Sequence, residues 1–331
     1  MATENPNLNH YLNKEVSELI KLEIYPIEDE LKERHKLFSL LLMAITKNYW
    51  NGIKRGRNGT YPLNPKKFGK YEFNDYYGHN IASIAVDAYG EVIDFEFNHN
   101  KLYNSSTEHA EARMVKRVFN LTQINDSWKT SLIEAKPKDD YNTFEDVTLY
   151  TTLESCSQCA GIMALARVKE IVYLQTDPGM YLIGNILRNL TRKIENVPNS
   201  NSNLTSPMPI SGEEFNFQFF NKLNDSYKSF KETVKTTSFY IPDNPTPQDK
   251  IDNSDSITSF LCTNSAFQIY TEATLEFESM SENNLIFPDY KPKNKKGEVI
   301  ENAKTNKMVL AEVKDFYQYA IKSGKRGTPH K

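Results

Sequence analysis

Cysteine is scarce in this sequence, which contains three cysteines among 331 residues. A small, odd number of cysteines cannot form the disulfide framework of a secreted scaffold, and it fits a reducing compartment. Long apolar runs are also missing, since none approaches the roughly 18 residues that a membrane-spanning helix needs. The first residues are rich in asparagine and lack the apolar stretch of a secretory signal. We therefore expect a cytoplasmic or nuclear protein that does not enter a membrane.

Neither sign of charge dominates, because 40 Lys and Arg residues stand against 43 Asp and Glu residues. A net charge of −3 excludes a generally basic nucleic-acid-binding chain, but it leaves room for a local basic patch. Residues 52–70 contain no acidic residue and carry aromatic side chains between the basic ones, which are Lys54, Arg55, Arg57, Lys66 and Lys67 among others. Such a loop can track a phosphate backbone and stack bases, or it can simply be solvated; both interpretations stay open.

Aromatic residues are abundant, with 19 tyrosines and 18 phenylalanines, so the chain can build a large core and is not disordered. Hydrophobic periodicity predicts the elements of an α/β fold. In chain order these are a helix over 28–50, a hairpin over 81–98, a helix over 109–119, a strand over 147–153, a helix over 156–168, a strand over 170–176, and helices over 180–193 and 213–234. Because strand, helix and strand follow one another, the two strands are expected to pair in parallel.

Composition divides the chain into three parts. Residues 1–26 are predicted to be a loosely held N-terminal arm, and residues 27–240 a single domain with a polar insertion at about 120–146. The following stretch, 241–256, is rich in proline and aspartate and is typical of a linker. Beyond it we expect an α+β extension over 257–331, with a β-rich run at 260–277 and a final helix over 308–321.

Two short motifs, His109-x-Glu111 and Cys156-x-x-Cys159, each open a predicted helix. Cysteines three residues apart on a first helical turn can reach one metal ion, and the helix N-terminus favours their thiolate form. Two thiolates and one imidazole would bind zinc and leave a fourth position for water, whereas structural zinc sites normally have four protein ligands. Glu111 could then accept and deliver the proton of that water as a general acid/base.

Each motif alone is weak, because His-x-Glu occurs by chance and Cys-x-x-Cys is also found in redox pairs and structural zinc knuckles. A structural zinc knuckle, or two unrelated helix starts, are therefore the alternatives to a catalytic site. The third cysteine, Cys262, lies in an apolar run and is expected to be an ordinary buried residue.

Taken together, the two motifs resemble the signature of the zinc-dependent cytidine/adenosine deaminase superfamily. The block from Thr148 to Asp177 is most like the tRNA adenosine deaminase branch. The resemblance implies a three-layer fold with a mixed five-stranded sheet between helices, and the presence of a histidine ligand resembles the subgroup whose last strands run parallel. It also implies a role for each site residue: Zn²⁺ ligands His109, Cys156 and Cys159, proton shuttle Glu111, and substrate contact Asn98, eleven residues before the histidine.

Three departures from that branch bear on the substrate. Ser155 replaces the family's proline before the first cysteine, which keeps the carbonyl that faces the departing amine but loses the fixed φ of proline. The segment 119–147 is longer than in the tRNA enzymes, and residues 177–185 replace their Gly/Ser-rich loop.

The resemblance predicts a hydrolytic deaminase that acts on the ring amine of a nucleobase, with adenine or another purine favoured. The base can belong to RNA, single-stranded DNA, a nucleoside or a free base, and the protein is expected to form a homodimer or heterodimer. The alternative is a catalytically silent deaminase-like partner subunit, or a nucleic-acid-binding scaffold that keeps the metal for folding.

Overall fold

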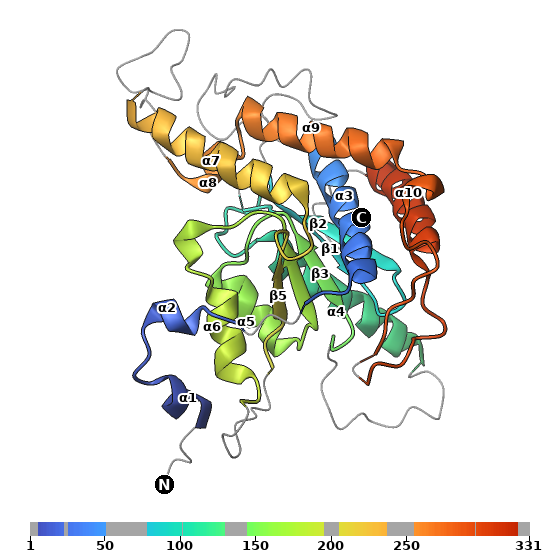
Figure 1. Ribbon diagram of the computed structural model, residues 1–331, viewed down its shortest axis with the longest axis horizontal. Coiled ribbons are helices and arrows are strands. Elements are labelled where there is room, and N and C mark those ends of the chain that lie inside the picture. Colours follow the sequence, from blue (N-terminus) through green and yellow to red (C-terminus); the bar gives the residue numbers. More distant parts are fainter. Residues whose placement is uncertain are drawn as a thin grey trace.

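The structure, a computed structural model, describes residues 6–22, 26–50, 78–100, 102–129, 144–194, 205–236, 255–294 and 296–323 (Figure 1). Its centre is a five-stranded sheet in the order β2-β1-β3-β4-β5. The strands are β1 Ala82–Val86, β2 Val92–Phe97, β3 Thr148–Thr151, β4 Glu170–Tyr173 and β5 Met208–Ser211. Strand β1 pairs antiparallel with both β2 and β3, whereas β3, β4 and β5 run parallel. The predicted mixed sheet with parallel last strands is thus confirmed.

The hairpin of β1 and β2 closes through a turn built by Asp87 and Gly90. The Asp87 carboxylate accepts the backbone N–H groups of Tyr89 and Glu91, at 2.9 and 2.8 Å. Gly90 has a φ of 87°, a conformation that a residue with a side chain rarely adopts. These residues confirm the predicted hairpin and set its register, in which Ala82 faces Phe97.

Strand β5 was not predicted from the sequence pattern, which assigned no element between the helices over 180–193 and 213–234. Pro209 lies inside the strand, and proline cannot donate a hydrogen bond to a neighbouring strand. The strand tolerates it because β5 is at the edge of the sheet, paired with β4 alone. A proline-containing edge strand of four residues gives little periodicity to detect.

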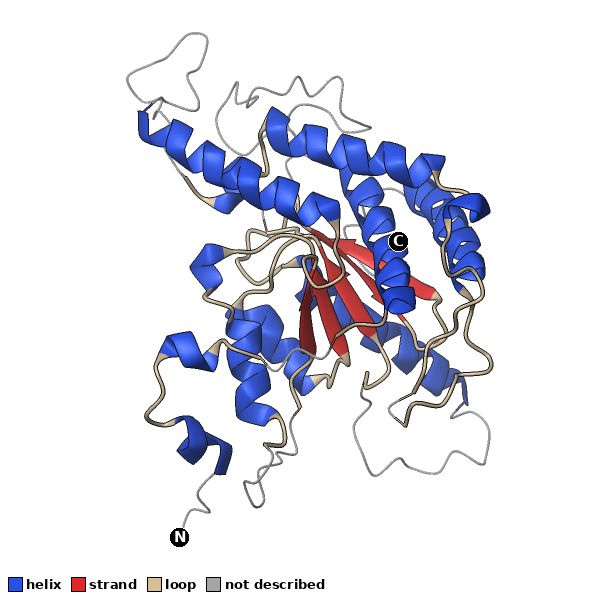
Figure 2. Ribbon diagram, viewed as in Figure 1, coloured by secondary structure: helices blue, strands red, loops and turns tan. Residues whose placement is uncertain are grey.

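Helices cover both faces of the sheet (Figure 2). One face packs against α4 and α5, with buried residues of both helices and of β3 and β4 in one cluster. The other face packs against α3, which also packs against α9 and α10, while α7 packs against α9; their buried residues form a larger cluster. The helices are α1 Pro6–Tyr11, α2 Val16–Leu19, α3 Asp29–Asn48, α4 Ala110–Lys129, α5 Ser157–Leu165, α6 Ile183–Thr191, α7 Gln218–Thr236, α8 Ile257–Phe260, α9 Asn264–Ser279 and α10 Asn306–Ser323, with 3₁₀ turns η2 Pro178–Met180 and η3 Glu282–Asn284.

Helix α3 forms where the sequence predicts a helix over 28–50, and it is the most buried helix of the larger cluster. Asp29 and Glu30 in its first turn and Lys47 in its last turn complement the helix dipole. Its second half is buried all round, because the sheet lies on one side and α9 and α10 lie on the other. A helix that is apolar on every face is what such a position requires.

The predicted β-rich run 260–277 is wrong, because these residues form α8 and α9. Thr263 caps α9 by accepting the backbone N–H of Ala266 at 3.1 Å. The buried residues of α9 recur at helical spacing: Ala266, Ile269, Tyr270, Ala273, Thr274 and Phe277. The isoleucine, tyrosine and threonine content suggested a strand, but packing against α3 decides the conformation, as strand propensity depends on context. Cys262 is fully buried, as expected.

The N-terminal arm is fastened to α6 over its described residues, in contrast to the predicted loose attachment. Asn7 of α1 donates to the carbonyl oxygen of Leu190 at 3.0 Å. Asn189 of α6 donates in return to the carbonyl of Lys21 at 2.9 Å, and Asn185 donates to that of Ile20 at 2.9 Å. Side-chain amides that bond to backbone carbonyls carry no periodicity, so the sequence gives no sign of these contacts.

Several predicted boundaries differ from the structure, those of α4 and α7 by the most. Helix α4 continues to Lys129 and so covers the first part of the predicted insertion at 120–146, whose residues 130–143 lie outside the described residues. Helix α7 begins at Gln218 rather than at 213. The linker prediction also falls outside the described residues over 241–254. No helix within the described ranges combines the length and apolarity that crossing a membrane requires.

Candidate metal centre

The side chains of the two motifs come together at the carboxyl end of the central strand of the sheet. His109 immediately precedes α4, and Cys156 is the residue that caps the N-terminus of α5, in extended conformation. Cys159 lies in the first turn of α5. Because β3 ends at Thr151 and α5 follows after a short loop, the chain delivers both cysteines to the carboxyl end of the central strand.

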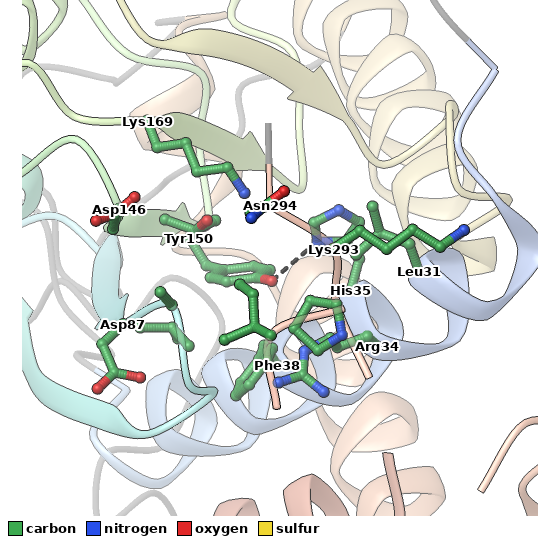
Figure 3. Close-up of a pocket in the computed structure, with 15 residues that line it drawn as sticks. Leu31, Arg34, His35, Phe38, Asp87, Asp146, Tyr150, Lys169, Lys293 and Asn294 are labelled. Atoms are coloured by element: carbon green, nitrogen blue, oxygen red, sulfur yellow. Dashed lines mark hydrogen bonds between the residues drawn. The ribbon is translucent and has the colours of Figure 1, made fainter. Parts of the chain in front are cut away.

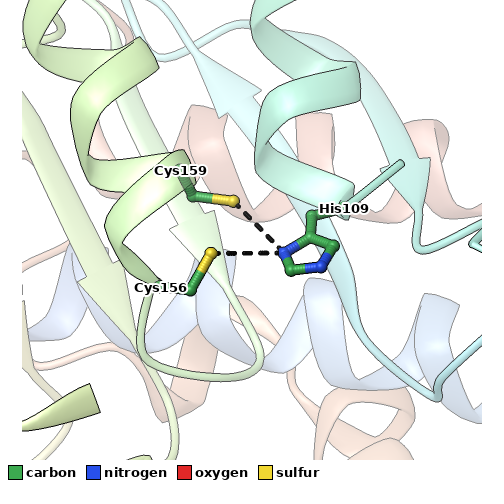
Figure 4. A group of neighbouring side chains, drawn as sticks. All are labelled: His109, Cys156 and Cys159. Carbon is green, nitrogen blue, oxygen red and sulfur yellow. Dashed lines mark hydrogen bonds between the residues drawn. The ribbon is translucent and has the colours of Figure 1, made fainter. Parts of the chain in front are cut away.

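The three side chains converge on a common point (Figure 4). The Nδ1 atom of His109 lies 3.3 Å from Sγ of Cys156 and 3.6 Å from Sγ of Cys159, and all three ligand atoms lie within 4.8 Å of one another. Tetrahedral zinc with its usual Zn–S and Zn–N distances separates its ligand atoms by about 3.5 Å. The distances therefore fit zinc. Cys159 is buried, whereas His109 and Cys156 are half-buried, so the group opens to one side.

Electrostatics favour an ionised cysteine at this point. A hydrogen bond from the Cys159 thiol, with a further one from His109, lowers the pKa of Cys156 to about 4. Cys156 in turn raises the pKa of His109 through their hydrogen bond. The hydrogen bond between Cys159 and Cys156, together with burial, raises the pKa of Cys159. Thiolates are the form of cysteine that binds metal, so Cys156 is prepared as a ligand and Cys159 would release its proton on binding.

Glu111 lies next to the triad, in the first turn of α4, and only 4% of its surface is exposed. Its Oε2 atom accepts a hydrogen bond from the thiol of Cys159 at 3.5 Å. Its Oε1 atom accepts one from the hydroxyl of Ser155 at 3.0 Å. Burial raises the pKa of the Glu111 carboxyl, which makes it a better proton acceptor than an exposed glutamate.

Residues 73–223, a little under half of the chain, match the MafB19-like deaminase family. This span contains the whole triad and Glu111. Residues 73–223 are a deaminase-family domain. They belong to the cytidine/deoxycytidylate deaminase-like superfamily, and the triad is typical of a deaminase zinc site.

Solved structures of deaminases also match the chain, at low identity. A tRNA:A34 deaminase shares 20% identity and a TM-score of 0.26, over 40% of this chain and 82% of that one. Guanine deaminase from Bacillus subtilis shares 23% identity and a TM-score of 0.23, over 29% and 50% of the two chains. Guanine deaminase from Nitrosomonas europaea shares 14% identity and a TM-score of 0.24, over 44% and 74%. No curated protein gives a significant match to the sequence.

Ser155 contacts Glu111 beside the triad in a way that the sequence did not reveal. The resemblance assigned it a backbone carbonyl near the departing amine, and that assignment stays a prediction. In the structure its hydroxyl donates to Glu111, and the residue is 5% exposed. A proline at this position could not make this bond. The sequence did show that serine replaces the family's proline here. From that replacement we predicted only the loss of a fixed φ and did not predict the new hydrogen-bond donor.

Asn98, the predicted substrate contact, lies at the end of β2 and is 1% exposed. Its Oδ1 atom accepts the backbone N–H of Asn100 at 3.1 Å, which forms a tight turn after the strand. The next residue, His99, donates its backbone N–H to the carbonyl of Glu108 at 2.9 Å. The turn therefore lies beside the segment that leads into His109. Its contact with a substrate stays a prediction.

The predicted nucleic-acid contacts fall outside the described residues: Lys54, Arg55, Arg57, Lys66 and Lys67.

A buried ion-pair network holds α4 on β2, and the sequence reasoning missed it. Arg117 pairs with Asp94, and Arg113 pairs with Glu96 at 3.2 Å and with Glu108 at 2.7 Å. All but Glu108 are nearly inaccessible to solvent. The two acids are two residues apart on a strand, and the two arginines are four apart on a helix, so each pair lies on one face. This spacing of acids on a strand and arginines on a helix could have indicated the network from the sequence.

Proposed function

We propose that this domain is a hydrolytic deaminase that replaces the ring amine of a nucleobase by oxygen, with zinc held by His109, Cys156 and Cys159. The observation that carries the proposal is the buried carboxyl of Glu111 beside the three ligand atoms. A purely structural zinc site has no use for such a carboxyl. Zinc bound at an open site of this kind makes hydroxide available from water near neutral pH.

Glu111 is the group that moves protons. It accepts a proton from the attacking water and delivers it to the base, so that water and the amine are converted into a carbonyl and ammonia. Its position supports this role, because a general acid/base must be within hydrogen-bond reach of the reacting atoms and must have a pKa near the working pH. Ser155 would orient the carboxyl through its hydroxyl, which bonds to it, and the family resemblance gives its carbonyl the role of facing the leaving ammonia.

The substrate class is a nucleobase, and a purine such as adenine is favoured by the likeness of residues 148–177 to the tRNA adenosine deaminase branch. Asn98 would contact the base or its sugar. The base can be presented in RNA, in single-stranded DNA, as a nucleoside or free. If the substrate is a polymer, Lys54, Arg55, Arg57, Lys66 and Lys67 would contact its phosphates, and binding would weaken steeply with salt. We also propose that the protein acts in the cytoplasm or nucleus, as a homodimer or a heterodimer.

The test is ammonia release by the purified, zinc-loaded full chain from adenine, guanine and cytosine as free bases, nucleosides and short oligonucleotides. Glu111→Gln should keep one zinc per chain and lose kcat by about 10²–10⁴-fold, the usual contribution of general acid/base catalysis. Glu272→Gln, on the exposed face of α9, is the matched control and should behave as the wild type. Wild-type turnover in Glu111→Gln would remove the proposed shuttle. Full zinc occupancy with no ammonia from any compound, until a second protein is added, would favour the silent-partner alternative.

A further inference from the structure

Two of the three cysteines of the chain, Cys156 and Cys159, form a close pair, and the third is kept apart from them. Their Sγ atoms lie 3.3 and 3.6 Å from Nδ1 of His109, and the three ligand atoms lie within 4.8 Å of one another. Cys262 is fully buried, and its neighbour Leu261 belongs to the core cluster on the face of the sheet that α3 covers. Cys159 belongs to the cluster on the opposite face. Among the three cysteines, the fold therefore leaves Cys156 and Cys159 as the pair that can form a disulfide.

The backbone at the start of α5 suits a disulfide between these two residues. Cys156 is the N-cap of the helix and Cys159 lies in its first turn. The backbone N–H of Ala160 donates to the carbonyl of Cys156 at 2.9 Å, so the first helical turn already includes Cys156. In a helix, Cα atoms three residues apart are about 5 Å from each other. A disulfide spans roughly 4.4–6.8 Å between Cα atoms, so rotation of the two side chains can join the sulfurs without moving the helix.

The two sulfurs differ in their access to solvent. Cys156 is half-buried, whereas Cys159 is fully buried. An oxidant that arrives from solvent therefore meets Cys156 first. The thiol of Cys159 is then close enough to react with the oxidised sulfur. Redox-sensitive cysteines share this arrangement, in which an accessible sulfur stands next to a second one that resolves it.

Polar side chains gather in a second place, a cavity beside the start of β3 (Figure 3). These side chains are already paired: His35 with the hydroxyl of Tyr150 at 2.9 Å, and Lys169 with Glu170 at 3.1 Å. No cysteine is among the described residues that line the cavity. Oxidation at the start of α5 therefore meets no competing sulfur there.

We propose that Cys156 and Cys159 are a site of reversible oxidation by a peroxide, and that the disulfide they form excludes zinc. The sulfur of Cys156 attacks one peroxide oxygen and the O–O bond breaks, which gives a sulfenic acid and one water from hydrogen peroxide. The thiol of Cys159 then displaces the hydroxyl group from that sulfur, which gives the disulfide and a second water. Two electrons pass from the two sulfurs to the peroxide. The inference rests on the zinc-binding part of the proposed function.

The disulfide form and the zinc-bound form exclude each other. Zinc binds the thiolate form of cysteine, and a disulfide contains no thiolate. Oxidation thus removes two of the three ligands and leaves His109, whereas bound zinc holds both sulfurs apart from each other. A thiol such as glutathione reduces the disulfide and restores both ligands. Loading of the metal, and with it the proposed deamination, therefore requires reducing conditions.

The test compares the full chain with and without zinc after treatment with hydrogen peroxide. The metal-free chain should lose about 2 Da and yield a peptide in which Cys156 and Cys159 are linked. Cys262 should keep its thiol. The oxidised chain should take up no zinc until dithiothreitol is added, and should then bind one zinc per chain. The zinc-loaded chain should keep all three thiols under the same treatment.

Two variants assign the sulfurs. Cys159→Ser should stop at the sulfenic acid of Cys156, which dimedone labels, whereas Cys262→Ala is the control and should form the disulfide as the wild type does. Addition of oxygen to the metal-free wild type without a linked peptide, an unlabelled Cys156 in Cys159→Ser, or zinc uptake by the disulfide form would overturn the inference. None of these measurements uses ammonia release. A chain that forms the disulfide and excludes zinc, yet releases no ammonia when zinc is bound, would overturn the proposed function alone.

Discussion

Ser155 holds the carboxyl of Glu111 beside the candidate metal centre without being one of the three candidate ligands. Its hydroxyl holds Oε1 of Glu111 at 3.0 Å, while the thiol of Cys159 holds the other oxygen. With zinc bound, Cys159 would be a thiolate and could not donate, so the Ser155 bond is the one that would persist. For the proposed proton shuttle, a carboxyl that is already held in position needs no further ordering during the reaction.

Replacement of Ser155 by alanine should lower kcat by about tenfold, the value expected for one hydrogen bond to a charged group, and should leave zinc content unchanged. Steady-state ammonia release and metal analysis measure the two quantities. Ser229→Ala, which removes a hydroxyl from the exposed face of α7, is the control. An unchanged kcat in Ser155→Ala would mean that the helix alone positions Glu111.

His35 makes the stability of the fold depend on pH. Burial lowers the pKa of its ring from 6.5 to about 4 in the folded chain. Between these values the unfolded chain binds a proton that the folded chain does not, so stability is complete above about pH 6.5 and falls as the pH drops towards 4. Between pH 7 and pH 5 this single group should account for about 2 kcal/mol.

His35→Gln removes the titration and keeps an acceptor for the Tyr150 hydroxyl. The loss of unfolding free energy between pH 7 and pH 5 should therefore be smaller in this variant than in wild type, by about 2 kcal/mol. Urea unfolding at both pH values measures it. His10→Gln, at an exposed position on α1, should keep the wild-type pH dependence. Identical pH dependence in wild type and His35→Gln would show that the ring is not buried neutral.

Single residues of the site were predictable where a motif and a helix start coincide. His109, Glu111, Cys156 and Cys159 satisfy this condition, since each lies in or beside a first helical turn. The buried contacts of Arg34 were not predictable, because its hydrogen-bond partners Lys304 and Asn306 lie 270 and 272 residues further along the chain. Only the folded chain brings them to α3.

At the scale of elements, the position of α4 on β2 controls the metal centre. Arg113 bonds to Glu108, the residue before the ligand His109, and to Glu96 of the strand. The arginine therefore fixes both the helix and the segment that enters it. Breaking a buried ion pair by removing one partner leaves an uncompensated charge, which is more costly than losing the pair altogether.

Arg113→Met should lower the unfolding free energy by about 3 kcal/mol and weaken zinc binding by roughly tenfold, because contacts that position a ligand tune metal affinity. Unfolding by urea and competition with a chelator measure the two effects. Arg167→Met breaks an exposed pair with Glu145 and should change stability by less than about 1 kcal/mol. Unchanged zinc affinity in Arg113→Met would limit the network to a role in stability.

Elements with strong periodicity were predicted well, and those specified by packing were not. The pattern of α3 and of the β1–β2 hairpin is visible without tertiary information. Helix α9 was not predicted because its residue types favour a strand in isolation, and the helical spacing of its buried residues has an effect only when they pack against α3. Strand β5 was not predicted because a short edge strand that contains a proline shows no alternation of apolar and polar residues.

At the scale of the whole molecule, the segments before and after residues 73–223 share one core with the deaminase domain. Tyr49, the residue that follows α3, donates its hydroxyl to the carbonyl of Ala320 in α10. The ring of Trp50 meets Phe267 of α9 edge-on and Tyr270 at a tilt, with ring centres 5.5 and 5.0 Å apart. The C-terminal helices therefore cover the face of α3 that the sheet does not, and they differ from an appended module, which would have a core of its own.

A chain that ends at residue 256 should consequently lose its fixed structure. Removing α9 and α10 uncovers the apolar surface of α3, and the expected result is a compact state that binds a hydrophobic dye, lacks near-ultraviolet circular dichroism and unfolds without a cooperative transition. Phe277→Ala in the full chain is a milder version and should cost about 3–5 kcal/mol, whereas Leu275→Ala, at an exposed position two residues away, should cost little. A truncated chain with a cooperative transition and full zinc occupancy would instead establish residues 27–240 as a domain that folds alone, with the C-terminal helices added to its surface.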